Sequence, residues 1–234
     1  MARSLATWRC QAALSACYDD GMRAMDPWTV AIGSSGGRGL DDLTALLTDL
    51  PPLFAAVVLV VLHRPPDRIS HLQAVLARTA RIPVVVALQG EHFEAGTAYI
   101  GDPDDHLILG ARTFGALVND PTGQYRNRTI DLLFHSVAQH GGERIIGVVL
   151  SGALDDGSRG LAAIRRAGGI TMVMAPSGWV WQGMPENAIA YDGGVDLIGD
   201  SREIARAIVE IVRDGPARLR AEPPVFPFWR PGEA

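Results

Sequence analysis

The sequence predicts an α/β protein with a mostly parallel, doubly wound sheet flanked by helices. Apolar segments rich in β-branched residues alternate with segments whose apolar residues recur at helical spacing. The strand-like segments are apolar on both faces, which is typical of parallel strands covered by helices on each side. The chain has 234 residues, 47% of them hydrophobic, which is enough for one large core without disulfides.

The first half of the pattern consists of three strands and two helices. A strand over residues 28–32 is followed by a glycine-rich turn and by a helix over residues 40–48 with leucines at helical spacing. Residues 54–62 are apolar throughout and rich in β-branched side chains, so they predict a second buried strand. A helix over residues 70–80 and a strand over residues 83–88 complete this half.

The second half begins with two shorter strands and then resumes the alternation. Residues 96–100 and 106–109, with turns between them, indicate a small β-hairpin region. The remaining predicted elements are a helix over 129–139, a strand over 145–150, a helix over 161–167, a strand over 170–174 and a helix over 201–213.

Three parts are distinguishable along the chain. Residues 1–26 form an N-terminal extension, residues 27–214 one globular domain, and residues 215–234 a proline-rich tail that cannot form a long helix. Both cysteines, Cys10 and Cys17, lie in the extension, so neither a disulfide framework nor a zinc site of four cysteines is predicted.

Composition excludes several classes of function. The formal charge of −5 argues against a nucleic-acid-binding protein with a broad basic face. No apolar run approaches the roughly 20 residues of a membrane helix, so membrane insertion is not expected. Residues 14–17 resemble the motif before a bacterial lipidation cysteine, but Arg9 and Gln11 interrupt the apolar stretch that such a signal needs. We therefore expect a cytoplasmic location.

A glycine-rich motif follows the first strand. Residues 33–37 fit the pattern G-x-S-x-G, which puts Ser35 on a sharp strand-to-helix turn with its hydroxyl outward. The free backbone amides at the start of the next helix can hold an oxyanion. A phosphate-binding loop is disfavoured because G-x-G-x-x-G does not fit in register and the lysine of a Walker loop is missing. A purely structural turn remains an alternative.

Two further polar groups follow apolar strands. His63 comes directly after the second strand, and Asp155 and Asp156 follow the strand that ends near residue 150. Carboxyl ends of parallel strands meet at one edge of a sheet, so a serine, a histidine and an aspartate are expected there together. A structural histidine and a helix-capping aspartate are the alternatives. The order Ser, His, Asp differs from that of α/β-hydrolases, which disfavours an ordinary lipase or esterase.

Nine short segments together form a distinctive pattern. In chain order they are V-A-I-G-S-S-G-G at 30–37, L-H-R-P-P at 62–66, G-T-A-Y-I at 96–100, D-H at 105–106, D-L-L-F-H-S-V-A at 131–138, G-V-V-L-S-G at 147–152, D-D-G at 155–157, G-M-P at 183–185 and A-I at 188–189. In the order and spacing of these segments, about residues 28–213 resemble the catalytic domain of the CheB-type protein-glutamate methylesterases of bacterial chemotaxis.

The resemblance implies a function and a site. By position, Ser35 would be the nucleophile, His63 the general base and Asp156 the acid of the triad. The implied reaction is hydrolysis of glutamate γ-methyl esters on methyl-accepting chemotaxis receptors through an acyl-enzyme, with deamidation of particular glutamines as a second activity. No cofactor and no metal are implied. The candidates for the oxyanion site and pocket are Gly36, Gly37, Gly152, Ala153 and Met184.

The chain also departs from the family pattern. Arg38 stands where a glycine is usual, and Ala153-Leu154 replace a common Met-Gly pair. Arg38 and Arg64 are candidates for the substrate rim, where they would attract an acidic receptor surface. The residues before the first strand are too few for the receiver domain of full-length relatives. A separate receiver or kinase protein is therefore a possible regulatory partner.

Two other functions stay open. A serine esterase or amidase acting on a different ester predicts turnover of activated esters without any receptor. A non-catalytic binding module with the same fold predicts a phenotype that is unaffected by Ser35→Ala.

Overall fold

A computed structural model describes residues 26–64, 70–103, 105–111, 113–120, 122–123, 125, 127–176 and 183–216. The predicted N-terminal extension and proline-rich tail lie almost entirely outside these residues. In the part of the chain that is described, no helix combines the length and the apolar character needed to cross a bilayer.

The main sheet has seven strands, and every adjacent pair is parallel. Its order is β3-β4-β2-β1-β7-β8-β9. The strands are β1 (Trp28–Ser35), β2 (Ala56–His63), β3 (Val84–Val86), β4 (Ala98–Ile100), β7 (Ile145–Val149), β8 (Ile170–Met174) and β9 (Leu197–Gly199). The chain passes from β1 to β2 on one side and returns to β7 on the other, so the direction of winding reverses at β1. The predicted doubly wound parallel sheet is confirmed.

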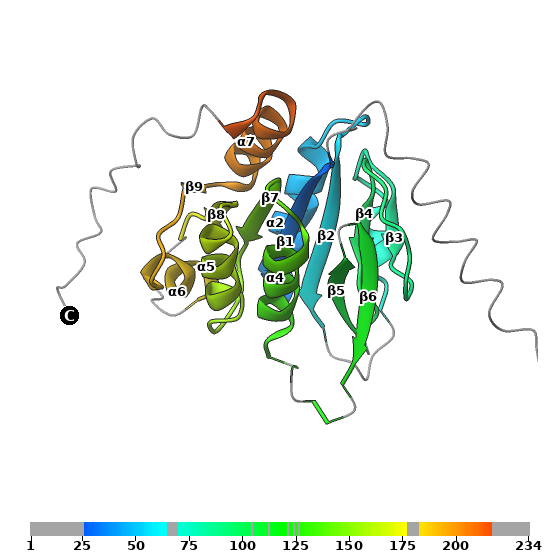
Figure 1. Cartoon of the computed structure of the whole chain (residues 1–234), viewed down its shortest axis with the longest axis horizontal. Coiled ribbons are helices and arrows are strands. Elements are labelled where there is room, and N and C mark those ends of the chain that lie inside the picture. The colour runs from blue at the N-terminus through cyan, green and yellow to red at the C-terminus, as the bar shows by residue number, and fades with distance from the viewer. Residues whose placement is uncertain are drawn as a thin grey trace, which may run out of the picture.

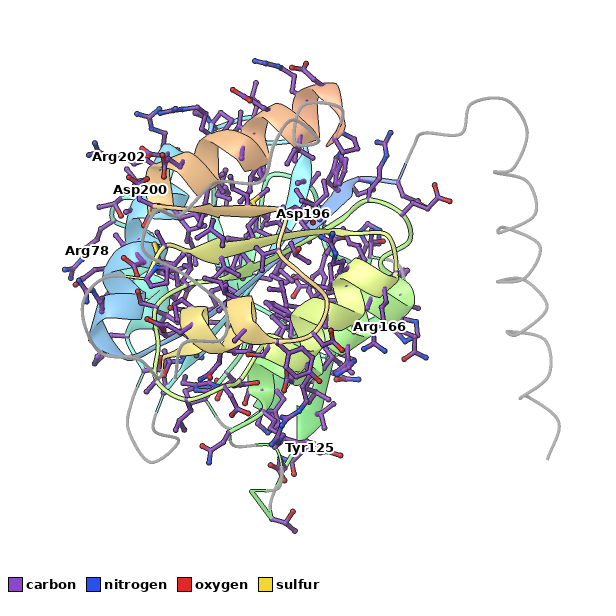
Figure 2. The ribbon with its side chains drawn as sticks, turned by 90° about the vertical axis from the view of Figure 1, so that its left-hand side faces the viewer. Arg78, Tyr125, Arg166, Asp196, Asp200 and Arg202 are labelled. Carbon is purple, nitrogen blue, oxygen red and sulfur yellow. The ribbon has the colours of Figure 1, made fainter. Side chains whose placement is uncertain are left out.

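Helices cover both faces of the sheet, and side chains of opposite parity on β1 enter two cores. Val30 and Ile32 belong to the core under α2 (Gly36–Asp49), α3 (Leu72–Leu76) and α7 (Ser201–Asp214). Ala31 belongs to the second core, under the three helices α4 (Thr129–His140), α5 (Ser158–Arg166) and α6 (Met184–Ala190). Figure 1 shows α4 in front of β1 with α2 behind it, and Figure 2 shows α7 across the sheet from α5 and α6.

A two-stranded antiparallel sheet confirms that the fold has a small hairpin region, but only one of its strands was predicted, because residues 98–100 form β4 of the main parallel sheet instead. The small sheet consists of β5 (Asp105–Ala111) and β6 (Phe114–Asn119). The Leu109 amide donates to Ser136 Oγ at 2.9 Å, which ties β5 to α4. The sequence pattern identified β5 but missed β6, because most of the side chains of β6 are only partly buried and show little alternation.

Other differences from the predicted elements are short-range. The helix predicted over 70–80 is limited to α3, and residues 77–79 follow it as turns before the chain enters β3 after Pro83. The sequence pattern also missed α6 and β9. Both are too short, at seven and three residues, to show a period.

Candidate active site

Ser35 and His63 are neighbours at the carboxyl edge of the sheet. Ser35 is the last residue of β1 and His63 the last of β2, and they are partners in the register of the two parallel strands. Successive side chains of a strand point to opposite faces, so Ser35 and His63 share the face on which Ala31 meets α4. This edge lies where the winding of the sheet reverses, which is the usual position of a site in such folds.

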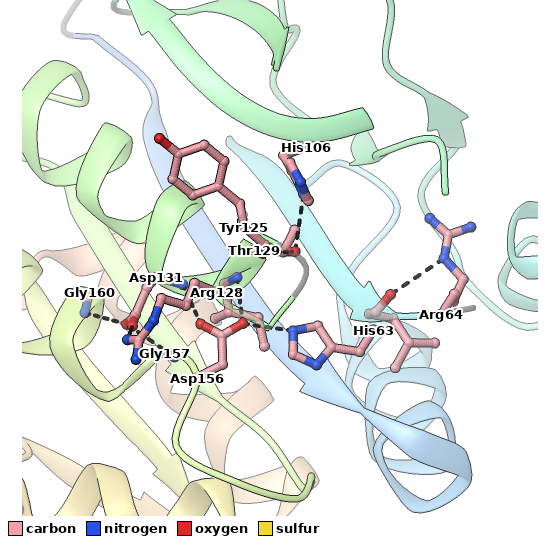
Figure 3. A network of polar contacts seen from close by, with 12 residues as sticks. His63, Arg64, His106, Tyr125, Arg128, Thr129, Asp131, Asp156, Gly157 and Gly160 are labelled. Carbon is pink, nitrogen blue, oxygen red and sulfur yellow. Dashed lines mark hydrogen bonds and ion pairs between the residues drawn. The ribbon is translucent and has the colours of Figure 1, made fainter. Parts of the chain in front are cut away.

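Asp156 completes the arrangement from the loop between β7 and α5. Its Oδ2 lies 2.7 Å from His63 Nε2, and its side chain is only 1% exposed against 21% for His63. Because the carboxylate accepts, Nε2 carries the proton and Nδ1 keeps its lone pair. Figure 3 shows the second ring nitrogen of His63 directed away from Asp156. Within the described residues no hydrogen bond joins Ser35 Oγ to His63, a contact that in catalytic sites often tightens only on substrate binding.

The turn after Ser35 is made by glycine rather than by serine. Ser35 has extended backbone (φ −149°, ψ 145°) and is the N-cap of α2, while Gly36 has φ +72°. A side chain at Gly36 would be strained by this left-handed conformation. The prediction of a serine on a strand-to-helix turn therefore holds in outline, with the unusual backbone one residue later. The first amides of α2 lie directly beside the hydroxyl-bearing residue and have no partner within the helix.

An open cleft of about 360 Å³ lies in front of Ser35. The β7 loop forms one side, and it is held against β1 because the Ser35 amide donates to the Ser151 carbonyl at 3.0 Å. Ala153 pairs with Gly183 across the cleft floor. The lining residues are Ser35, Gly36, Gly37, Arg38, Ser151, Gly152, Ala153, Ala175, Pro176, Gly183, Pro185 and Glu186.

Four of the five predicted oxyanion and pocket residues line this cleft, namely Gly36, Gly37, Gly152 and Ala153. Met184, the fifth, is completely buried, and its amide donates to the Gly152 carbonyl at 2.9 Å. It supports the cleft from beneath. Sequence reasoning missed the wall formed by residues 175–176, 183 and 185–186. Two signals were available: their position after the parallel strand β8, and the G-M-P segment at 183–185, which was matched to the family but not assigned to the cleft apart from Met184.

Gly152→Ala is expected to distort the site. A Cβ at this position would lie 2.2 Å from Met184 Sδ and 2.7 Å from Ser35 Cβ, so both must move. We expect a melting temperature lower by several degrees and a hydrolysis rate lower by about tenfold or more, as overpacking usually costs about 1–3 kcal/mol. Gly37→Ala is the matched control for stability, because a Cβ there meets nothing within 4 Å. Equal melting temperatures for the two variants would contradict this packing argument.

The two predicted rim arginines have different surroundings. Arg38 is exposed and lines the cleft. Arg64 is half-buried, donates to the Gly101 carbonyl at 2.5 Å and also donates to Ser70 Oγ. Burial lowers the pKa of Arg64, while the charge of Asp102 raises it. Arg64 thus links the end of β2 to Ser70, which precedes α3, and to Gly101, which follows β4. Its role at the substrate rim stays a prediction.

A second polar cluster, centred on His106, lies at the start of α4. His106 Nε2 is 3.3 Å from Asp120 Oδ2, and His106 Nδ1 is 3.1 Å from Thr129 Oγ1. These contacts tie β5 to the first residue of α4. Among the described residues, no three His, Cys, Asp or Glu side chains are grouped as ligands for a metal.

Known proteins are similar to this chain in sequence. The family described as CheB methylesterase matches residues 30–208. Protein-glutamate methylesterase/protein-glutamine glutaminase 1 of Burkholderia pseudomallei is 36% identical over 183 residues, which are 77% of this chain and 50% of that protein. The corresponding protein of Yersinia pestis bv. Antiqua is 35% identical over 191 residues, 80% of this chain and 54% of that protein. The chain thus spans about half the length of these curated relatives.

A solved structure agrees with these matches. The CheB methylesterase catalytic domain of Thermotoga maritima superimposes with a TM-score of 0.72 at 29% sequence identity. The match covers 80% of this chain and 100% of that domain.

Proposed function

The chain belongs to the CheB methylesterase family, and we propose that it is a serine hydrolase that removes methyl groups from glutamate γ-methyl esters of chemoreceptors. The observation that carries the proposal is the pairing of His63 Nε2 with the buried Asp156 at 2.7 Å, next to Ser35 as the register partner of His63. The printed names of the relatives support the ester substrate and add glutamine deamidation as a second activity.

The proposed chemistry needs only these side chains and nearby backbone amides. Ser35 Oγ attacks the ester carbonyl while His63 Nδ1 takes its proton, and the imidazolium is stabilised by Asp156. The tetrahedral oxyanion is held by amides at the start of α2, at Gly36 and Gly37, where the positive end of the helix dipole adds to the hydrogen bonds.

Collapse of the intermediate breaks the ester bond and completes the cycle. His63 returns its proton to the departing methoxide, which leaves as methanol, and an acyl-enzyme remains on Ser35. His63 then takes a proton from water as the hydroxide adds to the acyl carbonyl. The bond between the acyl carbon and Ser35 Oγ breaks, the imidazolium returns the proton to Oγ, and the product leaves as a glutamic acid that ionises to the carboxylate. With a glutamine substrate the leaving group is ammonia. No metal or organic cofactor takes part in this scheme.

The partners follow from the substrate. The methylated glutamates lie on the cytoplasmic helices of methyl-accepting chemotaxis receptors, so the proposal places the enzyme in the cytoplasm.

A separate receiver or kinase protein is proposed as the regulator. Adding a phosphorylated receiver protein should then change the rate of receptor demethylation, whereas the unphosphorylated form should not.

Methanol release from a methylated chemoreceptor tests the proposal directly. The wild-type protein is expected to release methanol in a time-dependent manner, with an unmethylated receptor as the blank. Turnover of a p-nitrophenyl ester without any action on several methylated receptors would point to a different ester substrate. Failure on both kinds of substrate would overturn the hydrolase proposal and favour a binding module.

The rim arginines give a prediction about encounter with the receptor. Arg38→Gln together with Arg64→Gln should lower kcat/KM on receptor a few-fold at low salt and weaken its salt dependence, because rim charges act mainly on association. We expect Arg38→Gln to account for most of the effect, since the Arg64 guanidinium is engaged with Ser70 and Gly101. Arg166→Gln, in the last turn of α5 (Figure 2), removes the same single charge as Arg38→Gln but away from the cleft, and it should leave both quantities unchanged. An unaltered salt dependence in the double variant would exclude electrostatic steering by these residues.

A further inference from the structure

Two aspartates, Asp131 and Asp156, exchange hydrogen bonds with each other's helices. Asp156 precedes α5, yet its carboxylate accepts from the Ile130 amide at 2.9 Å and the Asp131 amide at 2.8 Å, both in the first turn of α4. Asp131 lies on α4, and its Oδ1 accepts from the Gly157 amide at 3.1 Å and the Gly160 amide at 2.7 Å, at the start of α5. Figure 3 shows this reciprocal arrangement, with Asp156 between Asp131 and His63.

The exchange replaces ordinary caps. Arg128 and Gly157, the N-cap residues of α4 and α5, make no side-chain cap hydrogen bond. The free amides at each helix start are satisfied instead by the carboxylate of the other helix, which also carries the favourable charge for a helix N-terminus. Neither helix can shift without disturbing the cap of the other. The carboxylate that holds His63 is therefore fixed from two sides.

Asp131 has a mixed electrostatic environment. Its side chain is 7% exposed, and its Oδ2 lies 3.6 Å from both Arg128 Nη1 and Arg159 Nη1. The other charged groups facing it are Asp156 and His135. Burial raises the pKa of Asp131, the Gly160 amide opposes that rise, the Asp156 charge adds to it, and His135 and Arg128 oppose it. The net effect raises the pKa of Asp131, and its Oδ2 has no hydrogen-bond partner among the described residues. The two backbone amides at Oδ1 and the two guanidinium groups near Oδ2 favour the carboxylate form.

We infer that Asp131 is a positioning residue of the hydrolase, which holds Asp156 against His63 and adds a second negative charge behind it. The inference rests on the proposed function for its kinetic consequences. Its charge lies beyond Asp156 as seen from His63, so it favours the imidazolium that forms when Ser35 loses its proton. The hydrogen bonds at Gly157 and Gly160 immobilise the residues that follow Asp156, so its oxygen stays within reach of Nε2.

Asp131→Asn separates the charge from the hydrogen bonds. The asparagine oxygen can still accept from the Gly157 and Gly160 amides, while the negative charge is lost. The acid limb of the pH profile of kcat/KM is expected to move to lower pH, because the lost negative charge no longer favours the imidazolium. We also expect kcat to drop about tenfold at neutral pH with KM nearly unchanged. Asp131→Ala loses both contributions and should lower kcat further.

Asp155→Asn is the matched control. It removes an equal charge from the residue next to Asp156, but the Asp155 side chain is 53% exposed and pairs with Arg159 at 3.5 Å. Solvent screens an exposed charge, so kcat and the pH profile should stay near those of the wild type.

Two measurements decide the matter. The NMR signal of the Nε2 proton of His63 reports its hydrogen bond to Asp156 without any substrate, so it remains informative even if no methylated receptor is hydrolysed. The pH profile of ester hydrolysis is the second measurement. An acid limb at lower pH and a changed Nε2-proton chemical shift in Asp131→Asn, with both unchanged in Asp155→Asn, support the inference. An unchanged acid limb and chemical shift in a folded Asp131→Asn protein, or a loss of rate that only follows a lower melting temperature, overturn it.

Discussion

Ser35→Ala is expected to lower kcat/KM for ester hydrolysis by about three to six orders of magnitude. Without the hydroxyl no acyl-enzyme can form, and His63 is left with no proton to accept from the protein. The cleft and the amides of α2 remain, so a small residual rate over the uncatalysed reaction can persist. Stability should hardly change, because Ser35 is half-buried and makes no side-chain cap for α2. Single-turnover methanol release and circular dichroism melts measure the two quantities.

Ser34→Ala is the control that the chain itself offers. Ser34 is fully buried, and its hydroxyl donates to the Ser151 carbonyl at 3.3 Å. Adjacent residues of a strand point to opposite faces, so Ser34 lies away from His63. Its loss should lower stability by about 1 kcal/mol and leave most of the activity. An active Ser35→Ala protein, or an inactive but folded Ser34→Ala protein, would show that the nucleophile is assigned wrongly.

The positions of Ser35 and His63 could be predicted because one apolar run ends just before the glycine-rich motif that contains Ser35 and another ends directly before His63. Local periodicity located β1 and β2, and parallel pairing then had to bring their carboxyl ends to one edge. The choice between Asp155 and Asp156 is different in kind, because both follow β7 and both could reach a histidine. The structure separates them by burial, since Asp156 is 1% exposed and Asp155 is 53% exposed.

The rest of the site depends on contacts between distant segments. The wall at Gly183, Pro185 and Glu186 forms only when the start of α6 docks on the β7 loop, as the Met184-to-Gly152 hydrogen bond shows. The reciprocal caps join residues 25 to 29 positions apart. An acidic residue in the first turn of a predicted helix is common and usually serves its own helix, so nothing local indicated that Asp131 would serve α5.

Asp156→Asn is expected to lower kcat by about four orders of magnitude, through the wrong tautomer of His63 rather than through lost binding. Asp156 has three donors around it: His63 Nε2 and the Ile130 amide at Oδ2, and the Asp131 amide at Oδ1. An asparagine can present only one oxygen. If its NH₂ faces His63, Nε2 must accept, the ring proton moves to Nδ1, and Nδ1 can no longer take the proton of Ser35.

The opposite orientation of the asparagine is no better for the fold. With the oxygen toward His63, the NH₂ faces the Asp131 amide, and two donors meet at the start of α4. An unsatisfied buried donor costs about 1–3 kcal/mol, so Asp156→Asn should also melt several degrees lower. Asp155→Asn should match the wild type in both respects. ¹⁵N chemical shifts of the His63 ring identify the tautomer, and a ring that keeps its proton on Nε2 in an inactive Asp156→Asn protein would contradict the tautomer argument. Because a purely structural role of Asp156 would lower the melting temperature without moving that proton, the ring nitrogens distinguish a catalytic carboxylate from a helix cap.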